Sequence, residues 1–185
     1  MKVHSTRLAG VLIIEPSIFS DKRGHFLEIY QAKRYSQHGI TKPFVQDNIS
    51  FSTKGVLRGL HYQLKYPQAK LVMVAEGAIY DVAVDIRRGS PTFGRWVGIR
   101  LTSHDRTQIY IPEGFAHGFC VIGDRATVIY KCTDYYYPED ERGIIWNDPC
   151  LAIRWPIDNP VVSEKDASYP SLDKISEKDL PIFER

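Results

Sequence analysis

The sequence is dominated by short runs of apolar and β-branched residues that glycine, proline and aspartate interrupt. The clearest run, AIYDVAVDI, alternates strictly: one face carries Tyr80, Val82, Val84 and Ile86, and the other carries Asp81, Ala83 and Asp85. The other runs are GVLIIEP, HFLEIY, FVQDNISFS, GVLRGLHYQ, KLVMVAEG, GRWVGIRLT, TQIYIP, GFCVIG and ATVIYKCTDYY. Many short strands at this spacing are typical of an all-β sandwich or barrel. We therefore predict one jelly-roll domain over residues 1–185, with a few short peripheral helices.

Helical signals are few. The stretch EIYQAKRYSQHG, residues 28–39, is the best helix candidate, and Gly39 is its expected stop. A second short helix is expected to begin after Ser163, in SEKDAS. Beyond Tyr169 the chain is polar and punctuated by proline, so we expect it to wrap the surface of the barrel.

Composition excludes several classes of function. The formal net charge is +2, which is too close to neutral to indicate binding to nucleic acid or to an anionic membrane surface. The three cysteines, Cys120, Cys132 and Cys150, form neither a disulfide framework nor a zinc-binding spacing. The N-terminal run GVLIIEP is too short for a signal peptide or a membrane span. We expect a cytoplasmic protein with no membrane partner.

Two segments combine core-like residues with side chains that can do chemistry. GVLRGLHYQ contains Arg58 and His61, and IPEGFAHGF contains His117. Together they resemble the two short motifs of the cupin superfamily, whose small barrels hold a ligand inside. In metal-binding cupins a second histidine and a glutamate complete the first motif, but Gln63 and Lys70 stand at these positions here. A protonated lysine offers no lone pair to a metal ion, so we predict a barrel without a metal site.

A fixed ammonium beside a histidine suits the removal of a proton next to a carbonyl group. Lys70 would stabilise the enolate oxygen, while His61 would take the proton from carbon near neutral pH. In ATVIYKCTDYY, alternation puts Tyr130 on one face with Val128 and Cys132, and an inward phenol there could return a proton to the opposite side of the carbon. Each feature also has a structural reading: His61 as a hydrogen-bonded core histidine, Tyr130 as a core tyrosine, and PEGFAH as a turn between strands.

Longer motifs indicate one family. GVLRGLHYQ, KLV, YDVAVDIRRGSPTFGRWVG, IPEGFAHGF, YKCTDYYYPEDERGIIWNDP and SEKD closely resemble the dTDP-4-dehydrorhamnose 3,5-epimerase family, from about residue 7 to about residue 168. The resemblance implies a cupin-type jelly roll that needs no metal or other cofactor and forms a homodimer. It also implies an isomerase that inverts C3 and C5 of dTDP-4-dehydro-6-deoxy-D-glucose to give dTDP-4-dehydro-L-rhamnose, on the route to dTDP-L-rhamnose.

The resemblance further implies roles for individual residues. His61 looks like the family's base and Asp166 in SEKD like its carboxylate partner, with Tyr130 as the acid and Lys70 as the enolate stabiliser. A carboxylate on one imidazole nitrogen would fix the tautomer and stabilise the imidazolium. The residues that match substrate-contact and nucleotide-contact positions are Phe19, Arg23, Phe26, Glu28, Gln46, Asn48, Arg58, His117 and Tyr136. In the family, part of the segment FSDKRGHFLEIY reaches the site of the neighbouring subunit. Without the resemblance, that segment reads as a charged turn followed by a strand.

Arg58 conflicts with simple alternation. Along GVLRGLHYQ, strict alternation puts Arg58 on the face opposite His61, whereas the family uses the matching arginine in the site. Glycine marks positions where a strand is interrupted. We therefore predict an irregularity at Gly59, a β-bulge, that brings both side chains to one face.

Four alternatives stay open at this point. An enzyme with the same base could invert C3 alone. A related ketoisomerase would move the carbonyl group, and it would be expected to lack the lysine–tyrosine pair. A sugar-binding cupin without catalysis would need no histidine–carboxylate pair. A metal-dependent oxygenase would bind iron or nickel at His61 and His117.

Overall fold

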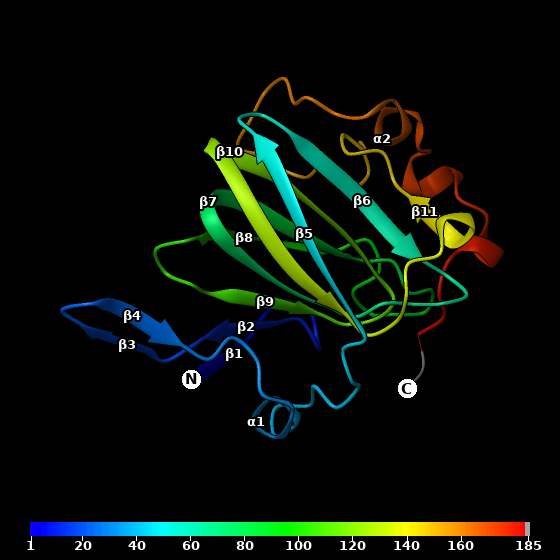
Figure 1. The fold of residues 1–185 in the computed structure, drawn as a ribbon. Coiled ribbons are helices and arrows are strands. Elements are labelled where there is room, and N and C mark those ends of the chain that lie inside the picture. The colour runs from blue at the N-terminus through cyan, green and yellow to red at the C-terminus, as the bar shows by residue number, and fades with distance from the viewer. Residues whose placement is uncertain (184–185) are drawn as a thin grey trace.

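A computed structural model describes residues 1–183 of the chain. Most of the regular structure is β-sheet, and the helices are short and peripheral (Figure 1). The strands are β1 (Lys2–Ser5), β2 (Leu12–Glu15), β3 (Ile18–Asp21), β4 (Gly24–Leu27), β5 (Gln46–Thr53), β6 (Leu57–Gln63), β7 (Lys70–Asp85), β8 (Trp96–Thr102), β9 (Gln108–Ile111), β10 (Phe115–Cys132) and β11 (Glu141–Gly143). The α-helices are α1 (Ala32–Ser36) and α2 (Glu164–Ser168), and short 3₁₀ helices span Pro138–Asp140, Leu172–Lys174 and Glu177–Asp179.

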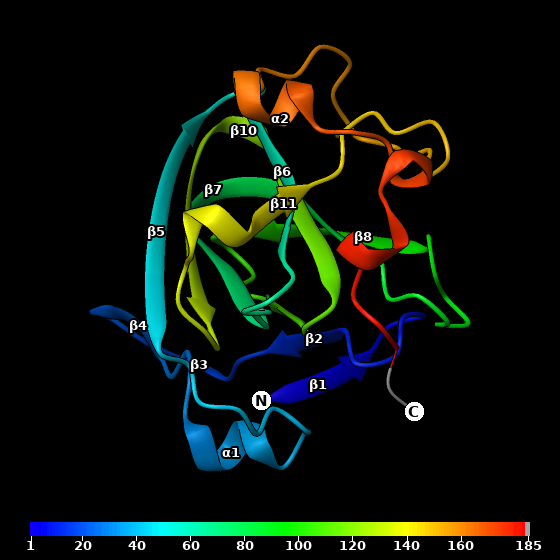
Figure 2. The same cartoon turned by 90° about the vertical axis from the view of Figure 1, so that its right-hand side faces the viewer.

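The main sheet contains nine strands and curls into a barrel (Figure 2). Along the sheet the order is β1-β2-β9-β7-β10-β6-β11, with β5 pairing with β10 and β8 with β7. Strand β7 pairs with β9 along one part of its length and with β8 along another, and β10 pairs likewise with β5 and β6. These two long strands, which also pair with each other, therefore connect the two sides of the barrel. The all-β, cupin-type jelly roll expected from the sequence is confirmed.

Strands β7 and β10 are longer than the sequence indicated. We expected KLVMVAEG and AIYDVAVDI to form separate strands, and Gly77 stands between them. Instead Gly77 lies inside β7 with φ +82°, where an added Cβ would overlap the carbonyl oxygen of Arg125. The register between β7 and β10 shifts at the same place. The glycine therefore bends a continuous strand around the barrel rather than ending it.

Alternate residues of β7 belong to two core clusters. One cluster contains Val82 and Val84, together with Ile86 directly after the strand, and the other contains Ile79 and Ala83. The alternation of AIYDVAVDI is therefore real, but both of its faces are buried. The two aspartates on the second face lie beside basic partners, His117 for Asp81 and Arg87 for Asp85.

The first helix is shorter than expected. It has five residues, whereas the sequence indicated a helix over residues 28–39. The Ile29 carbonyl oxygen accepts hydrogen bonds from the Tyr35 hydroxyl at 3.0 Å and from Gln108 Nε2 at 2.7 Å. These bonds hold Ile29 outside the helix, and Gln31 becomes the N-cap.

The chain after β11 covers one side of the barrel (orange and red in Figure 2). Helix α2 begins after Ser163, as predicted. Beyond Tyr169 the chain wraps the surface as expected, but Leu172 and Leu180 are buried in the core cluster that contains Val82. Within residues 1–183, no helix is long and apolar enough to cross a membrane.

Strands β3 and β4 form a separate hairpin that projects from the barrel (Figure 1). Its rings are largely exposed, at 65% for Phe19 and 71% for Phe26. The hairpin is held near the barrel by Arg106, whose Nη2 lies 3.3 Å from His25 Nε2. Its apolar surface is therefore not used within the chain.

Candidate active site

A cavity of about 310 Å³ lies inside the barrel, between β5, β6, β7 and β10. Eight of the predicted site residues line it: Gln46, Asn48, Arg58, His61, Lys70, His117, Tyr130 and Tyr136. They come from strands that are far apart in the sequence. The antiparallel pairing of β10 with β5, β6 and β7 brings them together.

A β-bulge at Gly59 directs two side chains of β6 into the cavity. His117 pairs with His61, but Phe119 pairs with Arg58, so β6 has one residue more than β10 between these two pairs. Gly59 has φ +111°, and an added Cβ would lie 2.6 Å from the His117 carbonyl oxygen. The predicted irregularity is confirmed. Because of it, Arg58 and His61 both line the cavity, against simple alternation.

A carboxylate from α2 holds the imidazole of His61. His61 Nε2 lies 2.8 Å from Asp166 Oδ1, and Asp166 Oδ2 accepts a hydrogen bond from the Gly59 N–H at 3.0 Å. Burial raises the pKa of the Asp166 carboxyl, but the hydrogen bonds from His61 and Gly59 outweigh burial and lower this pKa below its ordinary value. Asp166 therefore stays ionised, and Nδ1 is the nitrogen of His61 that remains for chemistry.

Lys70 places an ammonium at the cavity wall, at the first position of β7. The lysine ion pairs of the described residues involve Lys42, Lys131 and Lys165, but not Lys70. Burial lowers the pKa of Lys70 below that of an ordinary lysine. A cation inside the barrel that forms no ion pair with another described residue is available to an anion, or to an oxyanion that forms during a reaction.

Tyr130 extends from β10, where it pairs with Asn48 of β5 and Val72 of β7. It lines the cavity and packs against the core cluster that contains Val128. Burial raises the pKa of its phenol. The hydroxyl therefore stays protonated near neutral pH and can donate a proton.

A second histidine–carboxylate pair lies next to the first. His117 Nε2 is 2.8 Å from Asp81 Oδ2, and the two side chains are only 8% and 0% exposed. His117 and His61 face each other across β10 and β6. Within residues 1–183, Asp81 Oδ1 has no hydrogen-bond partner. The sequence did not predict this pair, because alternation places Asp81 on one face of a strand but does not indicate which side chain it contacts.

Glu141 is a cavity residue that sequence reasoning missed. It accepts a hydrogen bond from the Tyr136 hydroxyl at 2.8 Å and pairs with Lys165, and its Oε1 lies 3.8 Å from His61 Nδ1. Burial raises the pKa of Glu141, but the hydrogen bonds from Lys165 and Tyr136 outweigh burial and lower it. The segment YYYPEDERG contains several acids, and no spacing rule separates this one from its neighbours.

Ser50, in contrast, could have been found. Strand β5 alternates, and Gln46, Asn48 and Ser50 line the cavity from one face. Gln46 Nε2 donates to Asn48 Oδ1 at 2.9 Å, and Gln46 Oε1 accepts from the Tyr136 N–H at 2.9 Å. This row of amide and hydroxyl groups provides hydrogen-bonding positions along one wall.

The other four predicted contact residues lie outside this cavity. Phe19, Arg23 and Phe26 surround a separate hollow on the β3–β4 hairpin. Glu28 follows the hairpin and pairs with Arg34 at 2.9 Å. Within one chain, most of the predicted contact residues therefore form two groups, one inside the barrel and one on the projecting hairpin, and Glu28 belongs to neither group.

The two cavity histidines do not form a metal cluster. Within residues 1–183, no group of three or more histidine, cysteine, aspartate or glutamate side chains is arranged to hold a metal ion. His61 and His117 each use Nε2 to contact their own carboxylate.

The fold and the site define a class of protein: a cupin-type barrel in which a histidine, a lysine and a tyrosine line one internal cavity. The comparison with known families makes this specific. A family model described as dTDP-4-dehydrorhamnose 3,5-epimerase matches residues 5–174, and the chain belongs to this family. The family inferred from the motifs, and with it the class of isomerases, is confirmed.

The chain is similar to named proteins over most of its length. It is 52% identical to the dTDP-4-dehydrorhamnose 3,5-epimerase of Shigella flexneri over 168 residues, which cover 90% of this chain and 93% of that protein. It is also 52% identical to the protein of the same name from Neisseria gonorrhoeae over 167 residues and 90% of its own length, but it spans only 51% of that longer relative. The crystal structure of a dTDP-6-deoxy-D-glucose-3,5-epimerase from Legionella pneumophila in complex with dTDP-4-keto-L-rhamnose matches with a TM-score of 0.98 and 52% identity, over 100% of this chain and 99% of that chain.

Proposed function

We propose that the chain epimerises C3 and C5 of dTDP-4-dehydro-6-deoxy-D-glucose, which gives dTDP-4-dehydro-L-rhamnose on the route to dTDP-L-rhamnose. One observation carries the proposal: His61, Lys70 and Tyr130 line a single cavity inside the barrel. The family description and the ligand of the Legionella relative support the class of substrate.

His61 begins each inversion by removing the proton from the carbon next to the C4 carbonyl. Asp166 occupies Nε2, so Nδ1 takes the proton, and the ionised carboxylate stabilises the imidazolium that results. As electrons move toward O4, the Lys70 ammonium stabilises the enolate oxygen. General-base catalysis of this kind typically contributes roughly 10²–10⁴-fold to the rate.

Tyr130 completes the inversion by giving a proton to the opposite face of the carbon. Its raised pKa keeps the phenol protonated until the enolate forms. After one inversion His61 holds an extra proton and Tyr130 lacks one. Both groups must exchange their protons with water before the second centre reacts. In D₂O, each inverted carbon therefore gains its own deuterium from the solvent.

The remaining cavity residues suit the nucleotide. Gln46 and Asn48 offer amides for the edge of a base, and Arg58 and His117 offer donors for a diphosphate. The Tyr136 ring is 46% exposed at the cavity and offers a flat surface for a thymine.

A homodimer would supply the missing nucleotide contacts. Phe19, Arg23 and Phe26 lie outside the cavity of their own chain, on an element that projects from the barrel. On β5, Ile49 and Phe51 are also 70% and 59% exposed, which suits contact with a second copy. Light scattering tests the assembly, and a fully active monomer would exclude it.

A cytoplasmic location fits the state of the cysteines. Cys120, Cys132 and Cys150 are all free, which is typical of a reducing compartment. Fractionation of cells that express the chain tests this proposal, and recovery in an exported fraction would contradict it.

Incubation with the substrate in D₂O, followed by NMR of the sugar, tests the reaction. We expect deuterium at both C3 and C5. Exchange at C3 alone would replace the proposal by a C3-only epimerase, and no exchange at either centre would favour a sugar-binding cupin. In the His61→Ala control, exchange at both centres should be lost while binding of dTDP is largely kept.

A further inference from the structure

A second hollow, on the surface of the barrel, gathers three arginines that the proposed reaction does not use. It has a volume of about 600 Å³ and is lined by Arg7, Arg95 and Arg154, which come from the turn after β1, the β7–β8 connection and the segment before α2. These segments lie on the side of the barrel away from β5 and the β3–β4 hairpin (at the right in Figure 2). In residues 1–183, the arginines that pair with carboxylates are Arg23, Arg34, Arg87, Arg88, Arg125 and Arg142. Among the described residues, the three cations of this hollow thus lack the acidic partners that other arginines have.

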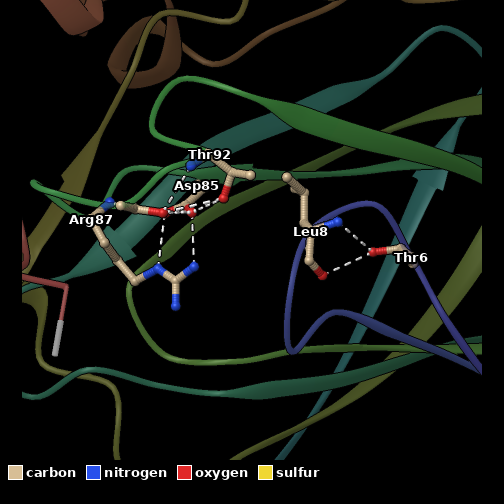
Figure 3. Close-up of polar contacts among 6 residues, drawn as sticks. Thr6, Leu8, Asp85, Arg87 and Thr92 are labelled. Carbon is tan, nitrogen blue, oxygen red and sulfur yellow. Dashed lines mark hydrogen bonds and ion pairs between the residues drawn. The ribbon is translucent and has the colours of Figure 1, made fainter. Parts of the chain in front are cut away.

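Arg7 is anchored rather than free. Its Nε donates to the Trp96 carbonyl oxygen at 3.0 Å, Nη2 donates to the same atom, and the guanidinium carbon lies 5.4 Å from the centre of the Trp96 ring. The Thr6 hydroxyl closes the turn, because it accepts from the Leu8 N–H and donates to the Leu8 carbonyl, both at 3.1 Å (Figure 3). These bonds leave Nη1 of Arg7 for a ligand.

A buried carboxylate fixes the turn that carries Arg95. Asp85 accepts hydrogen bonds from Ser90 Oγ and Thr92 Oγ1, each at 2.6 Å, and pairs with Arg87 at 2.8 Å (Figure 3). Its backbone N–H donates to the Arg95 carbonyl at 2.9 Å. Because the Asp85 side chain is 0% exposed and already paired, its negative charge does not face the hollow.

Another buried carboxylate fixes the loop that leads to Arg154. Asp148 Oδ1 accepts from the N–H groups of Cys150 at 2.7 Å and Leu151 at 2.9 Å, and its Oδ2 accepts a third backbone N–H. Trp96 Nε1 donates to the Leu151 carbonyl at 2.9 Å, which joins this loop to the strand beside Arg7. Hydrogen-bonded turns therefore present the cations of the hollow from three directions.

We propose that this hollow binds a ligand that carries a diphosphate group, at a site separate from the catalytic cavity. Arginine forks match phosphate oxygens in pairs, and three of them around one hollow suit a group with several negative oxygens better than a single carboxylate. The Arg7 guanidinium is already held by Trp96, so it loses little freedom when the ligand binds. Inorganic pyrophosphate and a nucleoside diphosphate share this chemistry, and the experiment distinguishes them.

Cys150 provides a reporter for the site. It is exposed at the hollow, whereas Cys120 and Cys132 are buried, so iodoacetamide should alkylate Cys150 first. The probe is inorganic pyrophosphate, and thymidine diphosphate is the second ligand. With pyrophosphate at ten times its dissociation constant, we expect alkylation of Cys150 to slow about tenfold. Stronger protection by thymidine diphosphate would assign the site to a nucleotide, and stronger protection by pyrophosphate would assign it to the free anion.

Three variants test whether the protection arises at this hollow. Replacing Arg95 and Arg154 together by alanine should abolish the protection, measured as the ratio of alkylation rates with and without ligand in the same variant. Arg100→Ala, which removes an exposed arginine of β8 outside the hollow, should keep it. Arg58→Ala, which removes a cation of the catalytic cavity, should also keep it. Circular dichroism confirms that each variant is folded.

Three outcomes would overturn the proposal. The first is protection that persists in the Arg95/Arg154 double variant, and the second is protection that disappears in Arg58→Ala. The third is equal protection of Cys150 by sodium chloride at the ionic strength of the pyrophosphate solution. Because none of these readouts depends on turnover, the result is independent of the proposed epimerase reaction.

Discussion

The Asp166→Asn variant keeps the size of the side chain but changes which of its atoms donate. In the native protein Oδ1 faces His61 Nε2 at 2.8 Å, and Oδ2 faces the Gly59 N–H at 3.0 Å. An amide has one acceptor and one donor for these two positions. If the oxygen stays on the Gly59 N–H, the NH₂ group donates to His61 Nε2, and the imidazole proton moves to Nδ1. That nitrogen then cannot take a proton from carbon.

The opposite orientation of the amide is less stable. It would place the NH₂ group against the Gly59 N–H, so that two donors meet at a site where Asp166 is 4% exposed. A buried donor without an acceptor costs about 1–3 kcal/mol. We therefore expect the first orientation, with the base in the wrong tautomer. Turnover should fall roughly 10³–10⁴-fold, or about 4–5.5 kcal/mol of transition-state stabilisation, as when a triad carboxylate is replaced by an amide.

The assay is NMR of the sugar for turnover, together with calorimetric titration of dTDP for affinity. We expect kcat to fall while the affinity for dTDP is kept. Asp148→Asn is the control, because Asp148 is also a buried carboxylate that accepts backbone N–H groups but lies outside the cavity. This role of Asp166 is refuted if Asp166→Asn keeps turnover within about tenfold of the native enzyme, or if Asp148→Asn loses as much.

Three further predictions concern the same cavity. Gly59→Ala should destabilise the fold by about 2–4 kcal/mol, because φ is +111° and the new Cβ would lie 2.6 Å from the His117 carbonyl oxygen; an unchanged denaturation midpoint would contradict this. Because burial lowers the pKa of Lys70, its ammonium is lost as pH rises through a value below the ordinary 10.5, so kcat/KM should fall there. Lys70→Arg should move that fall to higher pH, since arginine stays charged, and a fall at the same pH would assign it to another group. Tyr130→Phe should still exchange the C3 proton with D₂O but should no longer invert the carbon, and normal inversion would remove Tyr130 as the acid.

Most of the barrel could be predicted because its strands bury apolar residues in a regular pattern. Strands β1, β3 and β11 were not expected, since KVHS, IFSD and ERG carry little apolar periodicity and their pairing is set by their neighbours. The continuity of β7 through Gly77 was not predicted, because glycine can either end a strand or bend it. Pairing with β10 determines which of the two occurs. Helix α1 was overestimated because the hydrogen bonds to Ile29 come partly from Gln108, far along the chain.

A site residue could be predicted from the sequence where the signal for it lies within its own strand. His61 and Tyr130 carried a chemical signal within their own runs, and the conflict between Arg58 and His61 was enough to predict the bulge at Gly59. Asp166 followed only from family resemblance, because no spacing rule connects it with His61, 105 residues away. Glu141 was missed since its position at the cavity depends on how β11 pairs with β6.

Asp166 contacts both the Gly59 N–H and His61, and it comes late in the sequence. Strands β5 to β10 end at Cys132, so a ribosome has made these strands before it reaches the residue that accepts the Gly59 N–H and holds His61. Until α2 docks, the strand irregularity has no acceptor for its amide and the imidazole has no fixed proton. The strands that surround the cavity are therefore synthesised before the side chain that orients His61, and that side chain lies on a helix of only five residues.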